Sequence, residues 1–264
     1  MRAFRPTIER LEGRLTLAGD SFVEPPVITS NPITRVLTAK LTMAVTPAKV
    51  GDSTVTNAWT YNGSYVGPTL KAQPGDLLDL EVVNRLPSGQ ITNFHTHGLH
   101  VSPLGNGDNV LLEIQPGASN RYQIRIPADH PSGLYWYHPH HHTRVYDQIS
   151  KGLSGLLVIG DADGGATQLD SYTSHLLALK NALVTGSTIQ IPPSSSMPSN
   201  PIQTFTVNGQ LNPVLKVPQG QGQVFNVANM GANAFYSLQL NTAADGSGTS
   251  IPLILVGQDG NPLY

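Results

Sequence analysis

Hydrophobic and polar residues alternate along several short segments of the chain, with a period of two residues. The alternation is clear at residues 78–82 and 122–126, and it is longest where every second residue is apolar, at Leu37, Ala39, Leu41, Met43 and Val45. This pattern predicts strands that bury one face. The continuous apolar run Leu156–Ile159 predicts a strand covered on both faces, and residues 145–151 are the one segment expected to be helical.

Turn-forming residues separate these segments. Gly contributes 26 and Pro 21 of the 264 residues, many of them in Pro-Gly, Asn-Gly and Ser-Gly pairs. Short strands divided by such turns are typical of an all-β sandwich. Charged residues make up only 12% of the chain, which argues against a coiled coil or a long-helix protein.

The charge balance excludes further classes of protein. The chain has 15 Lys and Arg residues against 17 Asp and Glu residues, a formal net charge of -2. A nucleic-acid-binding protein normally carries a basic excess, so we expect no nucleic-acid partner. Because no uninterrupted apolar run reaches about 18 residues, we also expect no membrane-spanning helix.

A weak internal repeat divides the chain. Three short motifs recur about 145 residues further on: Tyr61-Asn62-Gly63 as Val207-Asn208-Gly209, Pro74-Gly75 near Pro218, and Asn84 as Asn229. The repeat predicts tandem domains of one fold at residues 33–163 and 164–264, after a leader and linker at residues 1–32. Counterparts of residues 119–160 would lie beyond Tyr264, so we expect the second domain to be incomplete and the chain to be a fragment or a truncated reading frame. An incomplete sandwich would expose strand edges and apolar surface, which favours self-association.

The first 20 residues are rich in arginine and lack the apolar core of a secretory signal. The segment resembles a leader found on some bacterial surface and exported proteins, and a disordered tail is the alternative. We expect an exported protein, periplasmic or extracellular.

Histidines are concentrated in two short segments, Phe94–His100 and Tyr135–His142, and each contains a His-x-His pair. On a strand, residues i and i+2 project from the same face with Cα atoms about 6.5–7 Å apart, so paired imidazoles can reach neighbouring metal ions. Neutral imidazole suits copper and zinc, and copper heads the affinity order of divalent ions. The chain has no cysteine, which rules out disulfides and a thiolate-ligated blue-copper site within these residues.

Other residues near these pairs have less specific interpretations. We expect surface or hydrogen-bonded histidines, rather than metal ligands, at His100, His130, His141, His142 and His175. Trp136 and Tyr137 are expected to be core or rim aromatic residues of the sandwich rather than a substrate box. Pro139 lacks an N–H, so its strand should be an edge strand or irregular there.

Several consecutive blocks resemble the multicopper oxidase family, the laccase-like and bilirubin-oxidase-like enzymes. The matching blocks are Tyr61-Asn62-Gly63, Gly67-Pro68-Thr69, Pro74-Gly75-Asp76, His95-Thr96-His97-Gly98, Gly133–His140 and Gly152–Val158. The resemblance covers residues 35–264 and implies cupredoxin-like (plastocyanin-like) Greek-key β-sandwiches. It also implies a second domain without copper ligands, and Phe235-Tyr236-Ser237-Leu238 indeed stands where the first domain has Phe94-His95-Thr96-His97.

The resemblance implies a role for each of four histidines in a trinuclear copper cluster. His95 would bind the type 2 copper, His97 and His138 one copper of the type 3 pair, and His140 the other. Asp108 stands where the family has an acidic residue near the type 2 copper that assists proton delivery. An ordinary Asx turn is the alternative for Asp108, because Asn106-Gly107-Asp108 is a turn-forming sequence.

The family couples oxidation of a substrate to four-electron reduction of dioxygen to water, with electrons entering through a Cys-ligated type 1 copper. Since this chain lacks that site, we expect weak copper binding and no oxidase turnover from these residues alone, and the reducing substrate stays unknown. A non-catalytic copper-sequestering exported protein is the alternative. A zinc hydrolase is disfavoured because the sequence near the histidines lacks a His-x-His-x-Asp-His pattern, which would supply further zinc ligands and an acidic group.

Overall fold

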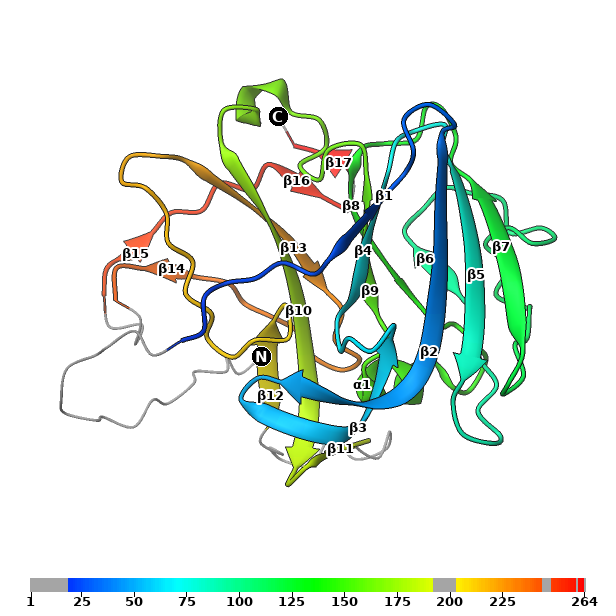
Figure 1. Cartoon of the computed structure of the whole chain (residues 1–264). Helices are drawn as coiled ribbons and strands as arrows, with labels where there is room; N and C mark the ends of the chain where they lie inside the picture. The colour runs from blue at the N-terminus through cyan, green and yellow to red at the C-terminus, as the bar shows by residue number, and fades with distance from the viewer. Residues whose placement is uncertain (1–18, 192–202, 244–247, 260, 264) are drawn as a thin grey trace.

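The computed structural model of the chain describes residues 19–191, 203–243, 248–259 and 261–263 (Figure 1). Most of the arginine-rich leader therefore lies outside the described residues. The first unit consists of short strands and one helix: β1 (Val27–Thr29), β2 (Val36–Val50), β3 (Ser53–Tyr61), β4 (Gly67–Ala72), β5 (Leu77–Arg85), β6 (His95–His97), β7 (Ser119–Arg125), β8 (Gly133–His138), α1 (Val145–Lys151) and β9 (Gly155–Ile159).

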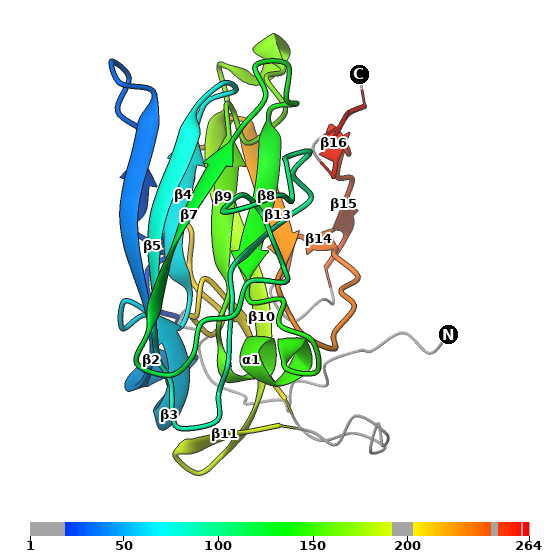
Figure 2. The same cartoon turned by 90° about the vertical axis from the view of Figure 1, so that its right-hand side faces the viewer.

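Two sheets face each other in the first unit and enclose its core. One has the strand order β3-β2-β5-β7 and the other the order β1-β4-β9-β8-β6. In Figure 2, β2 and β5 lie to the left of β8 and β9, so the two layers are seen edge-on. The core between the layers contains Leu41 and Leu80 from the first sheet and Leu70, Tyr137 and Leu157 from the second. This β-sandwich confirms the fold class that the period-two pattern predicts.

Strand β2 buries opposite faces along its two halves. Leu37, Ala39, Leu41 and Met43 are buried as the alternation predicts, but Val45 is 37% exposed, so its predicted burial is wrong. Beyond Met43 the even-numbered positions turn inward instead, and the strand ends in the fully buried Val50. The reason is that this half of β2 extends past the first core and packs in a second core shared with the rest of the chain.

The second unit repeats the strand arrangement of the first. It contains η1 (Thr167–Leu169), β10 (Thr173–Thr185), β11 (Thr188–Gln190), β12 (Thr204–Val207), β13 (Gln223–Asn229), β14 (Leu240–Asn241), β15 (Ser250–Ile251), β16 (Gly257–Gln258) and β17 (Asn261–Pro262). β10 pairs antiparallel with β12 and parallel with β13, as β2 pairs antiparallel with β3 and parallel with β5. The repeat read from the sequence therefore corresponds to a repeated topology.

Two Asn-Gly turns show the repeat at atomic detail. Asn62 and Asn208 adopt φ of 53° and 54°, a left-handed conformation that Asn tolerates better than most residues. The Asn62 side chain accepts from the Thr42 N–H (2.8 Å) and donates to the Lys40 carbonyl oxygen (2.9 Å). The Asn208 side chain accepts from the Ala178 N–H (2.7 Å) and donates to the Leu176 carbonyl oxygen (2.9 Å). Each asparagine thus fixes the strand beside its own turn.

A second hydrophobic core joins the two units. Val50, Val66 and Leu156 from the first unit pack with residues of the second unit, among them Ala178, Ala182, Ile189, Ala228 and Met230. Strand β9 therefore contributes Leu157 to one core and Leu156 to the other, and all five of its residues are buried. The prediction that Leu156–Ile159 is covered on both faces is confirmed.

The segment before β1 also crosses between the units. The Phe22 N–H donates to the Val214 carbonyl oxygen (3.0 Å), and the Leu176 N–H donates to Glu24 Oε1 (3.0 Å). A few residues later β1 pairs in parallel with β4 of the first unit. Residues 20–29, interpreted from sequence as leader and linker, therefore form a strap that touches both units.

Helix α1 occupies the segment that the sequence predicts as helical, so that prediction is confirmed. Asp147 lies in its first turn and Lys151 in its last, which suits the helix dipole, and Gly152 at φ 129° ends it. The helix also anchors the chain that leads into β6. Buried Gln148 accepts from the Thr92 hydroxyl and donates to the Ile91 carbonyl oxygen, both at 2.8 Å.

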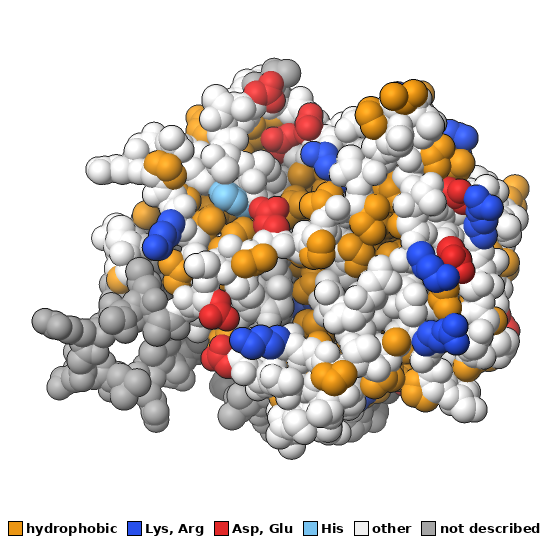
Figure 3. Space-filling model, viewed as in Figure 1, with side chains coloured by type: hydrophobic (Ala, Val, Ile, Leu, Met, Phe, Trp, Pro, Cys, Tyr) orange, Lys and Arg blue, Asp and Glu red, His pale blue; other side chains and the backbone are white. Residues whose placement is uncertain are grey.

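The surface carries mixed charges and some exposed apolar side chains. On the sheet containing β2, β5 and β7, Arg121 pairs with Asp79 and Lys40 with Glu81, and basic and acidic side chains lie side by side at the right-hand edge of Figure 3. In the second unit Phe235, Leu238, Leu253, Ile254 and Leu255 are exposed. Among the described residues, no helix is long and apolar enough to span a bilayer. Self-association through the exposed apolar side chains stays a prediction.

Candidate metal centre

The histidines lie on two paired strands at one edge of the sheet β1-β4-β9-β8-β6. β6 runs antiparallel to β8, with His95 opposite His138 and His97 opposite Trp136. Because these four residues share the same strand parity, they project from one face. The pairing therefore brings together side chains that are about 40 residues apart in the sequence.

Three imidazoles converge closely enough to share a metal ion. One ring nitrogen from each of His95, His97 and His138 lies within 4.8 Å of the other two. His97 Nδ1 and His138 Nε2 are only 3.3 Å apart.

His140 joins the group from outside the strand. Its ring centroid lies 5.0 Å from that of His95 and 5.8 Å from that of His138. Strand β8 ends at His138, because Pro139 has no N–H to continue the ladder. The prediction of an irregularity at Pro139 is thus confirmed, and the His140 N–H is held instead by the Asn93 side-chain oxygen (2.6 Å).

Asp108 contacts the cluster through His95. Its carboxylate lies 3.1 Å from His95 Nδ1 and accepts from the backbone N–H (3.1 Å) and hydroxyl (2.9 Å) of Thr96. When Nδ1 carries the proton donated to Asp108, Nε2 of His95 presents its lone pair to the cluster. The Asp108 carboxylate itself is buried, so it is more than the residue of an exposed turn.

His138 is oriented by a backbone group. Its Nδ1 donates to the carbonyl oxygen of Pro139 (2.9 Å), which leaves Nε2 as the nitrogen that faces the other rings. Burial, followed by the neighbouring histidines, lowers the pKa of His138 to about 3. Burial and the nearby His95 and His140 also lower the pKa of His97, against a smaller opposing effect of Asp259. Both rings are therefore neutral at pH 7, which is the form that binds metals.

Trp136 packs against two of the imidazoles. Its ring is stacked with His97 (centroids 4.8 Å apart, 29° between planes) and with His138 (4.2 Å, 28°). From the sequence, only a core or rim position is expected for Trp136. The sequence did contain a clue to this contact. Trp136 lies two residues before His138 on the same strand, so both side chains project from the same face.

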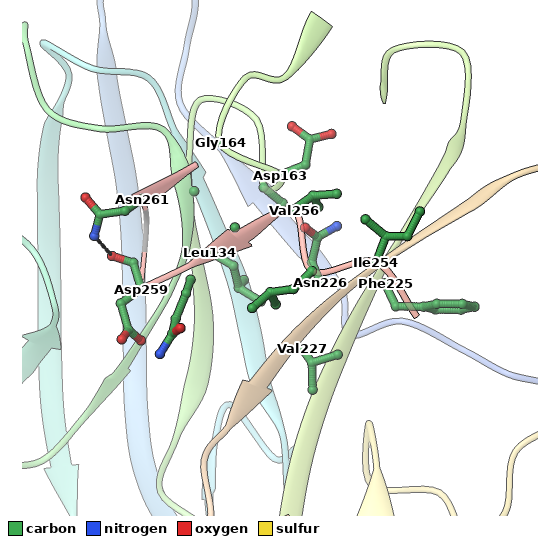
Figure 4. A pocket seen from close by; sticks show the side chains of 15 residues that line it. Leu134, Asp163, Gly164, Phe225, Asn226, Val227, Ile254, Val256, Asp259 and Asn261 are labelled. Carbon is green, nitrogen blue, oxygen red and sulfur yellow. Dashed lines mark hydrogen bonds between the residues drawn. The ribbon is translucent and has the colours of Figure 1, made fainter. Parts of the chain in front are cut away.

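A cavity adjoins His97, and a second cavity lies beside the first. The first, of about 430 Å³, is lined by His97, Trp136 and Asp259 among others. The second, of about 290 Å³, shares Leu134, Val227 and Asp259 with the first and extends towards Phe225 and Ile254 (Figure 4). Asp259 comes from the turn between β16 and β17, so the second unit contributes a carboxylate to this space, which sequence reasoning did not identify.

The other histidines have separate partners. His100 donates its backbone N–H to His130 Nε2 (3.0 Å), and His130 Nδ1 lies 2.9 Å from the Pro131 carbonyl oxygen. His141 Nε2 lies 3.2 Å from Glu113, and His175 lies 2.8 Å from the Gln223 side chain. His142 is exposed. These positions agree with the expectation that the five histidines are surface or hydrogen-bonded residues.

The donor set fits a transition-metal site. The convergent atoms are imidazole nitrogens without a thiolate, a combination that suits copper or zinc rather than calcium or magnesium. The carboxylate of Asp108, which lies in the loop after β6, and the Pro139 carbonyl oxygen orient two of the rings, which is the usual outer support of metal-binding histidines. The fold and this cluster together define a β-sandwich protein with a group of histidines that could hold a metal ion.

Comparison with known proteins matches part of the chain to a family. A family model described as multicopper oxidase matches residues 42–164, which include the four histidines and Asp108. This region of the chain therefore carries a domain that matches the multicopper oxidase family. A multicopper oxidase of Staphylococcus haemolyticus is 38% identical over 106 residues, which is 40% of this chain and 23% of that protein.

Other relatives extend over more of the chain. The cell division protein FtsP of Glaesserella parasuis is 25% identical over 242 residues, covering 86% of this chain and 50% of that protein. The crystal structure of a variant of the multicopper oxidase McoA from Aquifex aeolicus superimposes with a TM-score of 0.73 at 21% identity, covering 93% of this chain and 52% of that one. This likeness shows that both units have the fold of the cupredoxin proteins. The chain spans between about a quarter and a half of these relatives.

Proposed function

We propose that the chain supplies half of the ligands of a trinuclear copper centre in a multicopper oxidase. In this assignment His95 binds the type 2 copper, His97 and His138 one type 3 copper, and His140 the other. The observation that supports it best is the convergence of imidazole nitrogens from β6 and β8 within 4.8 Å. The family membership of residues 42–164 supports copper over zinc.

Bound copper would supply one-electron redox chemistry for the reduction of dioxygen to water. The residues of the chain hold and orient the ligands for it. Asp108 accepts the His95 Nδ1 proton, and the Pro139 carbonyl oxygen accepts that of His138. Burial keeps the rings of His97 and His138 neutral, so that no proton competes for the lone pairs at neutral pH.

We further propose that Asp108 moves protons during oxygen reduction. Its carboxylate is the one anionic group within hydrogen-bond distance of a cluster imidazole in the described part of the chain. In a complete homologous enzyme, Asp108→Asn should slow oxygen reduction and leave reduction of the type 1 copper unchanged. Equal oxygen-reduction rates in the two proteins would refute this role.

We propose that these residues alone do not carry out oxidase turnover. The 264 residues contain no cysteine, so they cannot ligate a type 1 copper through a thiolate, and His97 and His140 are exposed. The reducing substrate would be bound near a type 1 site, and nothing in this chain identifies it. The arginine-rich leader supports our proposal that the protein is exported.

The test is a copper titration of the purified chain, with bound copper counted by metal analysis and its type read by electron paramagnetic resonance. We expect copper to bind with a type 2 spectrum and without intense absorption near 600 nm. Oxidation of phenols or diamines accompanied by such absorption would contradict the proposed inactivity. Tight, stoichiometric copper binding without any effect on oxygen would favour the alternative of a copper-sequestering protein.

A further inference from the structure

We propose that Trp136 is a positioning residue of the metal centre, and that its indole fixes the orientation of the His97 and His138 rings. The inference rests on the proposed copper-binding function, because it concerns how the same ligands are held. Trp136 would not bind the metal itself, and its role would be to hold two of the side chains that do.

The indole of Trp136 and the imidazoles of His97 and His138 form one close group of rings. The centroids of Trp136, His97 and His138 form a triangle with sides of 4.2, 4.8 and 5.5 Å. Two rings on opposite faces of an indole would be much further apart than 5.5 Å, so the imidazoles are neighbours on it. The planes of both are within 29° of the indole plane, in the range of stacked aromatic pairs. One rigid surface therefore aligns two ligands at once.

Among the described residues, His97 lacks the hydrogen-bonding support that the other two rings have. His95 is oriented by Asp108 and His138 by the Pro139 carbonyl oxygen. Within the described residues, the ring of His97 has only His138 Nε2 within hydrogen-bond distance, and that atom is itself a metal-binding nitrogen. A metal-binding histidine normally has its second nitrogen fixed by a carboxylate, a carbonyl or water. Stacking on Trp136 is what limits the tilt of the His97 ring here.

The indole of Trp136 is itself held in place by its strand and by a core. Trp136 lies in β8 directly opposite His97 and is paired on its other side with Leu156 of β9. It also packs against the core shared by the two units. A side chain anchored on a central strand and against a core can hold its neighbours in place, whereas a freely rotating surface residue could not.

The experiment compares two variants of Trp136 with matched variants of Trp59, the other tryptophan, which lies on β3 in the first core. Trp136→Phe keeps an aromatic face, and Trp136→Leu removes it; Trp59→Phe and Trp59→Leu are the controls. In the metal-free protein, nuclear Overhauser effects between the Hε1 protons of His97 and His138 report whether the two rings stay together. In a copper titration, the affinity and the paramagnetic resonance spectrum report the consequence for the metal.

We expect Trp136→Leu to abolish the Overhauser effect between the two rings and to weaken copper binding by about 10- to 100-fold, the range found when outer support of a ligand is lost. Trp136→Phe should retain the effect and lose less affinity. The Trp59 variants, even if less stable, should keep both the effect and the copper spectrum. Should Trp136→Leu not fold, the Trp136→Phe and Trp59→Phe pair decides, since only the former should broaden the copper spectrum.

Failure of the proposed function can be told apart from failure of this inference. If the wild-type chain binds no copper, the proposed function fails, and the Overhauser effect still decides whether Trp136 orders the rings. If the wild type binds copper and Trp136→Leu binds it with the same affinity and spectrum, the positioning role is overturned and the proposed function stands.

Discussion

The ammonium of Lys180 donates a 2.6 Å hydrogen bond to the backbone carbonyl oxygen of Tyr65 and thereby links the second unit to the first. It donates a second bond of 2.6 Å to the Gly152 carbonyl oxygen and lies 4.0 Å from the centre of the Tyr65 ring. The side chain is 1% exposed, and the described residues place no carboxylate against it. A buried cation without an anionic partner therefore lies at the junction of the two units.

Lys180 makes the free energy of unfolding depend on pH. Burial lowers its pKa in the folded protein from the usual 10.5 to about 7. Between these values the unfolded chain binds a proton that the folded chain lacks, so stability should rise with pH, by at most about 1.4 kcal/mol per pH unit. Below pH 7 both states are protonated, and this contribution is flat.

The check is urea unfolding of the wild type and Lys180→Met at several pH values from 7 to 9.5. We expect the slope against pH to be smaller in the variant. Lys40→Met removes an exposed lysine of the first unit and should keep the wild-type slope. Identical slopes in all three proteins would show that Lys180 titrates normally.

The two Asn-Gly turns should tolerate glycine better than alanine. Asn62→Ala places a Cβ-bearing residue without a compensating side chain at φ 53° and removes the bonds to Thr42 and Lys40. We expect a loss of about 2–4 kcal/mol in the free energy of unfolding. Asn62→Gly also loses these hydrogen bonds, but glycine adopts a positive φ without strain, so the loss in the free energy of unfolding should be smaller. Asn208→Ala and Asn208→Gly should follow the same order, and chemical denaturation measures all four.

The repeat and most strands could be predicted from the sequence because they depend on local patterns. Alternation identified the core-facing residues of β2 up to Met43, and the turn motif identified Asn62 and Asn208 as equivalent. The exposure of Val45 and the burial of Lys180 were beyond such reasoning. The second core, which turns the other face of this half of β2 inward, and the contacts of Lys180 both join residues more than 100 positions apart in the chain. An alternating pattern also carries no information about which face a strand buries once it passes from one core to another.

The candidate site was predicted in part. The His-x-His spacing correctly indicated that His95 and His97 share one strand face, and the structure brings them to His138. The second pair behaves differently, since only His138 lies on a strand and His140 is positioned by Asn93. Trp136 and Asp259 were missed because stacking across strands and the approach of a distant turn leave no spacing motif.

Single histidine-to-alanine substitutions should distinguish the histidines that bind copper from those that only lie nearby. We expect His95→Ala and His97→Ala each to lower the amount of copper bound per chain, because each removes a nitrogen of the convergent group. His142→Ala should leave copper binding unchanged, since His142 is exposed beside the motif. Metal analysis after equilibrium dialysis gives the comparison. Copper content that drops equally in all three variants would mean that the binding is nonspecific.

Asp108 should affect copper through His95 rather than through the fold. Asp108→Ala leaves His95 Nδ1 without its carboxylate, and we expect copper affinity to fall by about 10- to 100-fold. The same variant leaves two donors of Thr96 unpaired in a buried place, so a loss of about 1–3 kcal/mol in stability should accompany it. Asp129→Ala, at an exposed loop position, is the control for both measurements. Unchanged affinity in Asp108→Ala would limit the residue to a structural role.

The strap that precedes β1 gives the two units a connection besides the peptide link at residues 161–165. Its hydrogen bonds to Val214 and Leu176 join an early piece of chain to a late one, and the shared core adds to them. A protease nick in the glycine-containing link would consequently not release two halves. The cleaved protein should elute as a single species in gel filtration and come apart into two fragments only in denaturant.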